Sequence, residues 1–125
     1  MLPTQPIKDC VLIVEDDDAV RETLADLLQE EGYRVAEAAN GKEALHRLRS
    51  AEPPCIILLD LMMPVMSGWE FREQQRQDPL LAAIPVAVVT GVRNTLDKVA
   101  ALDAVGYFQK PIDLSALLAT VAQYC

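Results

Sequence analysis

Two patterns of apolar and polar positions alternate along the chain: short strand-like runs and longer segments with helical spacing. The runs at 10–14, 55–59 and 84–90 are short and almost continuously apolar, which is typical of strands buried on both faces. Residues 33–38 alternate as a half-buried strand does, and 106–110 form a further strand-like run. The pattern therefore predicts five strands.

Segments between these strands have helical spacing. After the acidic stretch 15–18, apolar residues recur every three or four positions until Gly32, the usual place for a helix to stop. Asp113 is suited to cap a final helix, because its side chain can accept an otherwise unpaired backbone N–H. The further helices are expected at 40–50, 68–77, 94–104 and 114–124.

Strands that alternate with amphipathic helices indicate a parallel sheet covered on both faces. We predict an α/β fold with a single (βα)5 doubly wound domain over residues 10–125, after an N-terminal extension of residues 1–9. Composition shows no linker and no second domain.

Composition narrows the classes of function. The chain has 125 residues and a formal net charge of −8, which disfavours direct nucleic-acid binding. No apolar run approaches the roughly 20 residues that span a bilayer, and the first residues lack the apolar region of a signal peptide. We expect a cytoplasmic protein without membrane contact.

Three cysteines, Cys10, Cys55 and Cys125, are odd in number and lack the spacing of a metal site. We therefore expect three free thiols in a reducing compartment.

Polar residues stand where the predicted strands end. Glu15 and Asp16 follow the first strand, Asp60 the third, Thr90 ends the fourth and Lys110 ends the fifth. In open α/β sheets, ligands bind beyond the carboxyl ends of the strands, where the strand order reverses. In a sheet of order 2-1-3-4-5, the first and third strands are neighbours, so the three carboxylates converge.

Three converging carboxylates repel one another and suit a hard divalent cation, Mg²⁺ or Mn²⁺. An ammonium group and a hydroxyl beside the metal can neutralise phosphoryl oxygens. An aspartate can itself be the nucleophile, as in aspartyl-phosphate chemistry. The constellation predicts Mg²⁺-dependent phosphoryl transfer onto a carboxylate.

The chain resembles bacterial response-regulator receiver domains over about residues 10–122. Four successive motifs carry the resemblance: VLIVEDDDAVRETL, IILLDLMMPVMSG, VAVVTG and GYFQKP. The family has a flavodoxin-like fold with strand order 2-1-3-4-5. The resemblance implies a signalling domain that phosphorylates itself and is not a turnover enzyme.

The resemblance also implies roles for single residues. Asp60 matches the phosphoacceptor and Lys110 the lysine that contacts the phosphoryl group. Asp16 matches the direct Mg²⁺ ligand, Glu15 the acid that acts through a water molecule on the metal, and Met62 the position that offers its backbone carbonyl.

By the same resemblance Thr90 is the switch hydroxyl and Tyr107 the switch aromatic, although Tyr107 taken alone could be ordinary core packing. The Lys110–Pro111 bond should be cis. Phosphorylation would reshape the face formed by 94–104, 106–110 and 114–124, which could also support a homodimer.

Partners implied by the resemblance are a sensor histidine kinase or a histidine phosphotransfer protein, and a downstream effector or an output domain outside this sequence. The start of the first helix, around Val20 and Thr23, would dock the kinase; substituting both should slow transfer from the cognate kinase. Whether the receiver stands alone or belongs to a larger regulator or hybrid kinase is left open.

Met62 and Val92 are the variable positions two residues after the acceptor and the switch hydroxyl. Since neither side chain can activate water, we hypothesise slow self-dephosphorylation. A Met62→Asn, Val92→Glu variant should then hold its phosphoryl group for a shorter time. The methionines 62, 63 and 66 are expected to pack within their loop.

Three other functions remain. A hydrolase of the haloacid-dehalogenase kind would need a second acid where Met62 stands. A flavodoxin-like binding module would need a phosphate-cradling loop where residues 15–18 are acidic. A degenerate receiver would only bind partners, which the complete set of Asp60, Thr90 and Lys110 disfavours.

Overall fold

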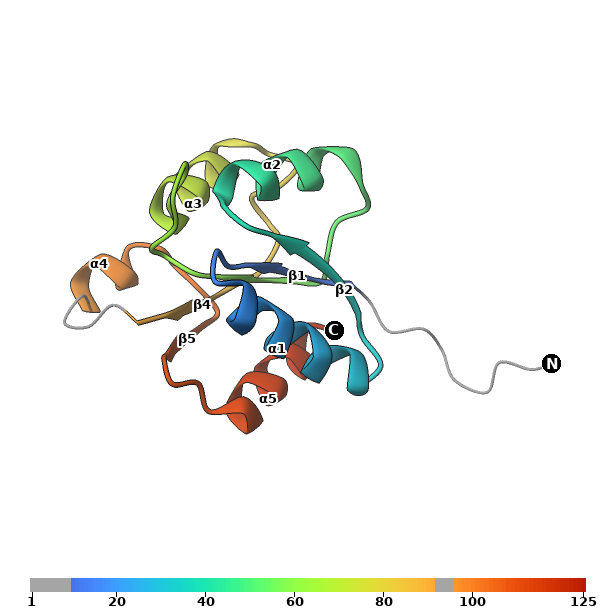
Figure 1. Cartoon of the computed structure of the whole chain (residues 1–125). Coiled ribbons are helices and arrows are strands. Elements are labelled where there is room, and N and C mark those ends of the chain that lie inside the picture. Colours follow the sequence, from blue (N-terminus) through green and yellow to red (C-terminus); the bar gives the residue numbers. More distant parts are fainter. Residues whose placement is uncertain (1–9, 92–95) are drawn as a thin grey trace.

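The computed structural model describes residues 10–91 and 96–125, and its five parallel strands form one sheet of order β2-β1-β3-β4-β5 (Figure 1). The strands are β1 (Cys10–Val14), β2 (Arg34–Ala38), β3 (Ile56–Leu59), β4 (Val86–Thr90) and β5 (Gly106–Gln109). The helices are α1 (Asp18–Glu30), α2 (Gly41–Ser50), α3 (Gly68–Gln77), α4 (Leu96–Ala100) and α5 (Leu114–Tyr124). The predicted fold class and strand order are confirmed.

Helices cover both faces of the sheet, with α1 and α5 on one face and α2 and α3 on the other (Figure 1). Successive residues of β1 serve different layers: Val11 and Ile13 pack with α1 and α5, whereas Leu12 and Val14 pack with α2 and α3. Strand side chains point alternately to the two faces, so a strand covered on both sides must be apolar throughout. This is why the central strands lack polar alternation.

A smaller core lies beside α4. Leu61, Val88, Val99 and Leu102 are buried in it, and Tyr107 packs against it from β5. Tyr107 is paired with Val88 across the β4–β5 ladder. This third core connects the loop after β3 with α4 and β5.

Most of the predicted boundaries hold to within one or two residues. Gly32 follows α1 with φ 94°, a left-handed conformation that favours glycine. The helix predicted over 94–104 is shorter, because α4 ends at Ala100 and the chain turns at Asp103, whose φ is 52°. Residues 94 and 95, the extension 1–9 and Val92 lie outside the described residues.

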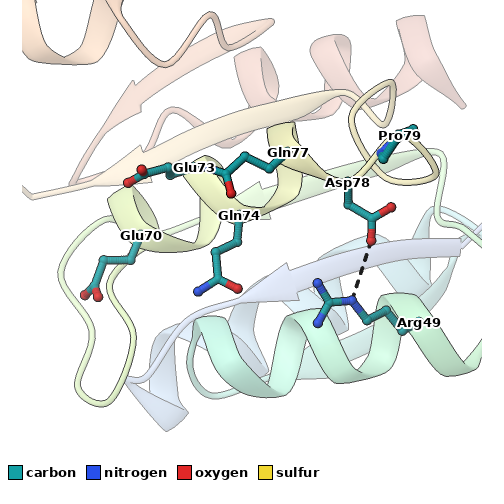
Figure 2. Close-up of a pocket in the computed structure, with 7 residues that line it drawn as sticks. All are labelled: Arg49, Glu70, Glu73, Gln74, Gln77, Asp78 and Pro79. Atoms are coloured by element: carbon teal, nitrogen blue, oxygen red, sulfur yellow. Dashed lines mark ion pairs between the residues drawn. The ribbon is translucent and has the colours of Figure 1, made fainter.

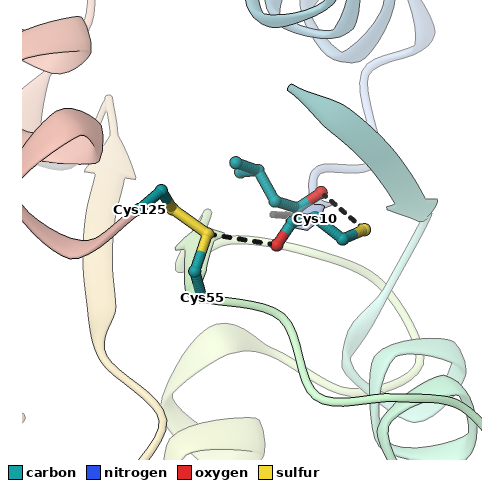
Figure 3. The surroundings of a disulfide bond; sticks show 4 residues. Cys10, Cys55 and Cys125 are labelled. Atoms are coloured by element: carbon teal, nitrogen blue, oxygen red, sulfur yellow. Dashed lines mark hydrogen bonds between the residues drawn. A yellow bond between two sulfur atoms is a disulfide. The ribbon is translucent and has the colours of Figure 1, made fainter. Parts of the chain in front are cut away.

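The expectation of three free thiols is wrong. Cys55 and Cys125 form a disulfide, while Cys10 is free (Figure 3). The two bonded residues are 70 positions apart in sequence, and only the fold brings the start of β3 next to the end of α5. Counting cysteines along the chain could not reveal this proximity.

The helices in the described part of the chain include none that is long and apolar enough to cross a membrane.

Candidate functional site

Three acids meet at the carboxyl edge of the sheet, as predicted. Glu15 and Asp60 directly follow β1 and β3, and their backbone N–H groups donate to Ala38 and Val14 carbonyls, each at 3.0 Å. Asp16 is the third member. One carboxylate oxygen from each acid lies within 4.8 Å of the others.

Lys110 approaches two of these acids from the end of β5. Its Nζ lies 2.6 Å from Glu15 Oε1 and 3.7 Å from Asp60 Oδ2. Its backbone N–H donates to the Thr90 carbonyl at 2.9 Å, and the Lys110–Pro111 bond is cis, as predicted. The β4–β5 ladder thus places the ammonium group over the acids.

Burial and the neighbouring charge of Glu15 disfavour the ionised form of Asp60. Its surroundings raise its pKa to about 7, chiefly through burial, then through the hydrogen bond with Glu15 and its charge. The charge of Lys110 and the backbone amide of Met62 lower the pKa of Asp60, but they offset only part of this effect. Without a further cation, the cluster therefore carries more negative charge than it can stabilise.

The pKa of Lys110 itself is raised. Burial alone would lower it, but the hydrogen bond to Glu15 and the charges of Asp60, Glu15 and Asp16 outweigh burial. Lys110 therefore stays cationic at physiological pH.

The cluster fits a hard divalent cation. All three side chains offer oxygen ligands, two of them are buried (Glu15 2 % and Asp60 5 % exposed), and the exposed Asp16 leaves one side open to solvent. Mg²⁺ prefers oxygen ligands and usually retains several waters, so an open acidic site suits it.

The other predicted site residues lie on β4, on β5 and in the loop after β3. Thr90 is fully buried at the end of β4, and Tyr107 is half-buried in the third core. The Met62 side chain is 62 % exposed and does not pack within its loop, whereas Met63 and Met66 pack against the core under α2 and α3. The metal-binding role implied for Met62 concerns only its backbone carbonyl.

Gly68 is a positioning residue that the sequence reading did not identify. A Cβ at this position would collide with the Asp60 carbonyl oxygen and would lie 2.8 Å from the Leu61 Cα. The Gly68 N–H also donates to the Leu61 carbonyl at 2.9 Å. Only glycine lets α3 begin against the backbone that carries Asp60. Gly68 stands in the motif IILLDLMMPVMSG, but the sequence does not show that its Cα approaches the Asp60 carbonyl.

The acid cluster is distinct from the surface hollow of about 610 Å³ between α2 and α3 (Figure 2). Arg49 and Asp78 face each other there, with 3.6 Å between Nε and Oδ2. None of the predicted site residues lines this hollow, which is formed by Arg49, Glu70, Glu73, Gln74, Gln77, Asp78 and Pro79. The predicted site is therefore not in this hollow.

The family model of the response regulator receiver domain matches residues 11–122. The chain belongs to this family. As a receiver domain of two-component signalling, it is 34% identical over 113 residues to Protein PilH of Pseudomonas aeruginosa, covering 89% of this chain and 93% of PilH. It is 40% identical over 111 residues to response regulator MprA of Mycolicibacterium vanbaalenii, covering 87% of this chain but only 47% of MprA.

Solved receiver structures have the same fold. Chemotaxis protein CheY4 of Vibrio cholerae matches with a TM-score of 0.83 and 32% identity, covering 94% of this receiver domain and 98% of CheY4. Response regulator TrrA of Thermotoga maritima, solved in complex with Mg²⁺-BeF, matches with a TM-score of 0.83 and 28% identity, covering 94% and 100%. The family and fold implied by the resemblance are confirmed.

Proposed function

We propose that this receiver domain accepts a phosphoryl group on Asp60 from a histidine kinase or a histidine phosphotransfer protein, in an Mg²⁺-dependent reaction. The observation that carries the proposal is the cluster itself: a buried carboxylate lies beside two further acids, with Lys110 Nζ 3.7 Å away. The proposal assigns the receiver function to residues 10–125 and places it in the cytoplasm.

The chemistry forms one bond and breaks another. A carboxylate oxygen of Asp60 attacks the phosphorus, the P–N bond to the donor histidine breaks, and the departing imidazole keeps the electron pair and takes up a proton. Lys110, whose Nζ lies 3.7 Å from Asp60 Oδ2, neutralises charge on the transferring group. The hydroxyl of Thr90, a buried residue at the end of β4, would donate to a phosphoryl oxygen.

Glu15, Asp16, Asp60 and the Met62 carbonyl would hold the Mg²⁺, with Mn²⁺ as a substitute. When bound, the ion neutralises negative charge that Lys110 leaves uncompensated.

The residues beside Asp60 favour a signalling switch over a turnover enzyme. An aspartate-nucleophile hydrolase needs a second acid to activate water, and Met62 supplies none at the corresponding position. The phosphoryl charge would instead draw the Thr90 hydroxyl towards Asp60 and let Tyr107 move. This would change the face formed by α4, β5 and α5, which a downstream effector, an output domain or a second copy would read.

The test is incubation with acetyl phosphate, with and without Mg²⁺, followed by intact-mass measurement. We expect one phosphoryl adduct that requires Mg²⁺ and is absent from Asp60→Asn. Asp26→Asn, an exposed acid on α1, is the matched control and should be modified like the wild type. A folded protein that binds Mg²⁺ without forming the adduct would identify a degenerate receiver, and continuous phosphate release would identify a hydrolase.

A further inference from the structure

Cys55 and Cys125 are each fixed by a backbone hydrogen bond, and both pack against the same core. The Cys55 N–H donates to the Cys10 carbonyl and the Cys125 N–H donates to the Val121 carbonyl, each at 2.9 Å. Their Cα atoms are 5.4 Å apart, within the range that a disulfide requires. Neither hydrogen bond involves the sulfurs, so we expect the reduced cysteines to stay close to each other.

The site can also accommodate the reduced state. Cys55 Sγ lies 3.3 Å from the Cys10 carbonyl oxygen (Figure 3). A disulfide sulfur carries no proton, but a reduced Cys55 thiol could donate to this oxygen. Both cysteines are half-buried, which leaves them within reach of small thiols and disulfides.

We propose that Cys55 and Cys125 form a redox-responsive modification site, where oxidation fastens the end of α5 to the start of β3. The inference goes beyond phosphoryl transfer and does not depend on it. Disulfides in reducing compartments are usually transient and redox-sensing, so a cytoplasmic receiver with this pair would form the bond under oxidative conditions.

A small-molecule disulfide is the oxidant we specify. A thiolate of the pair attacks it, its S–S bond breaks and one small thiol leaves with a proton. The second cysteine then attacks the mixed disulfide, forming the Cys55–Cys125 bond and releasing the second small thiol. Two molecules of the small thiol reverse both steps and regenerate the small-molecule disulfide, so electrons and protons balance in each direction.

The bond acts on the helix that completes the proposed switch face. Leu117 and Val121 anchor α5 in the core shared with α1, and Cys55 and Cys125 pack against that core. The disulfide adds a covalent anchor after the last turn of α5 and closes a loop with a sequence separation of 70. Closing so long a loop restricts the unfolded chain strongly, so oxidation should raise the melting temperature by roughly 10 °C.

The experiment equilibrates the protein with oxidised or reduced glutathione, alkylates the remaining thiols and measures intact mass, peptide maps and thermal unfolding. After oxidation, we expect alkylation at Cys10 alone; after reduction, at all three cysteines, with the lower melting temperature. Hydrogen exchange of the amides at 121–125 should be about tenfold slower in the oxidised protein.

Matched variants separate this site from other effects. Cys125→Ser should melt like the reduced wild type under both conditions, whereas Cys10→Ser should keep the full difference, since only the Cys10 backbone carbonyl is involved. Asp60→Asn should keep it too, so the result is independent of phosphorylation. Mixed disulfides with glutathione, pairing through Cys10, or equal stability and exchange in both states would each overturn the proposal. The unmodified wild type carries the main comparison, so the test does not depend on any variant folding.

Discussion

Asp60 is buried among charges that favour its protonated form, and this has a consequence for stability. Its folded pKa of about 7 lies above the ordinary aspartate pKa of 3.8, so the folded protein holds the proton more tightly. This contribution to the free energy of unfolding is complete below pH 4 and is lost as the pH rises through 7. In metal-free buffer, Asp60→Asn should therefore stabilise the protein by about 2 kcal/mol at pH 8 and much less at pH 5.

Urea unfolding at the two pH values with a chelator measures this difference. Asp26→Asn on the exposed side of α1 is the control and should change stability little at either pH. The same gain for Asp60→Asn at pH 5 and pH 8 would show that ionisation of this carboxylate is not what costs stability.

Val65 offers a second prediction at the residue scale. It has φ 69° in the loop between β3 and α3, where a β-branched side chain is strained, and its side chain is 75 % exposed. Val65→Gly should remove the strain at a smaller cost in unfolded-chain entropy, for a net gain of about 0.5–1 kcal/mol. Thermal unfolding of the variant and the wild type would measure this gain in stability. Val65→Ala, which keeps a Cβ at positive φ, should gain less, and a less stable glycine variant would contradict the strain argument.

Individual site residues differ in how far the sequence could predict them. Glu15, Asp16, Asp60 and Lys110 could be placed together because each stands where an apolar strand ends, and parallel strands end at one edge. The need for glycine at position 68 depends on the approach of α3 to the Asp60 carbonyl. No pattern in a single sequence contains that distance.

Among the secondary-structure elements, α3 and the end of α4 are joined by a buried polar network. Arg72 donates to the Leu102 carbonyl at 2.9 Å, to the Asp103 carbonyl at 3.1 Å and to Gln75 Oε1 at 2.8 Å. The fully buried Gln75 donates to the Leu81 and Ile84 carbonyls at 3.0 and 3.1 Å. The network secures both the turn after α4 and the loop before β4.

Arg72→Met should destabilise the protein by about 3 kcal/mol, because it leaves buried acceptors without a donor. Arg76→Met is the matched control: Arg76 also donates to a carbonyl of this turn, that of Ala101 at 2.7 Å, but it is exposed. It should cost less than about 1 kcal/mol. Chemical denaturation of both variants gives the comparison, and equal losses would argue against a special role for the buried network.

The elements themselves were predictable because periodicity reports burial directly, and this worked for the strands and for α1, α2, α3 and α5. The length of α4 was predicted incorrectly. Arg72 and Arg76 on α3 donate to carbonyls of the turn that follows α4, and periodicity along the chain does not report such contacts between distant residues. The polar composition of 68–77 carries no sign that Arg72 and Gln75 are buried. Burial of a fully hydrogen-bonded polar group leaves no hydrophobic signal.

For the molecule as a whole, the three cores suggest which part can move. The cores between the sheet and α1/α5 and between the sheet and α2/α3 share β1, β3 and β4, so they stabilise each other. The third core is the smallest among the described residues, and it contains Val99 of α4 and Tyr107 of β5 beside the end of the strand that carries Thr90. A charge added at Asp60 should therefore change this region before the two larger cores.

Beryllium fluoride with Mg²⁺ can stand in for the phosphoryl group in a test of this idea by hydrogen exchange. In the wild type, we expect exchange to change by about fivefold or more over 98–109 and in α5, with little change in β1 and β3. Thr90→Val preserves shape but removes the hydroxyl; it should still bind the analogue but lose most of the change at Tyr107 and α4. Asp26→Asn should respond like the wild type. If Thr90→Val responded fully, the hydroxyl would not couple the site to this face. The coupling would then have to run through Lys110, whose backbone N–H donates to the Thr90 carbonyl and whose ammonium group forms an ion pair with Asp60.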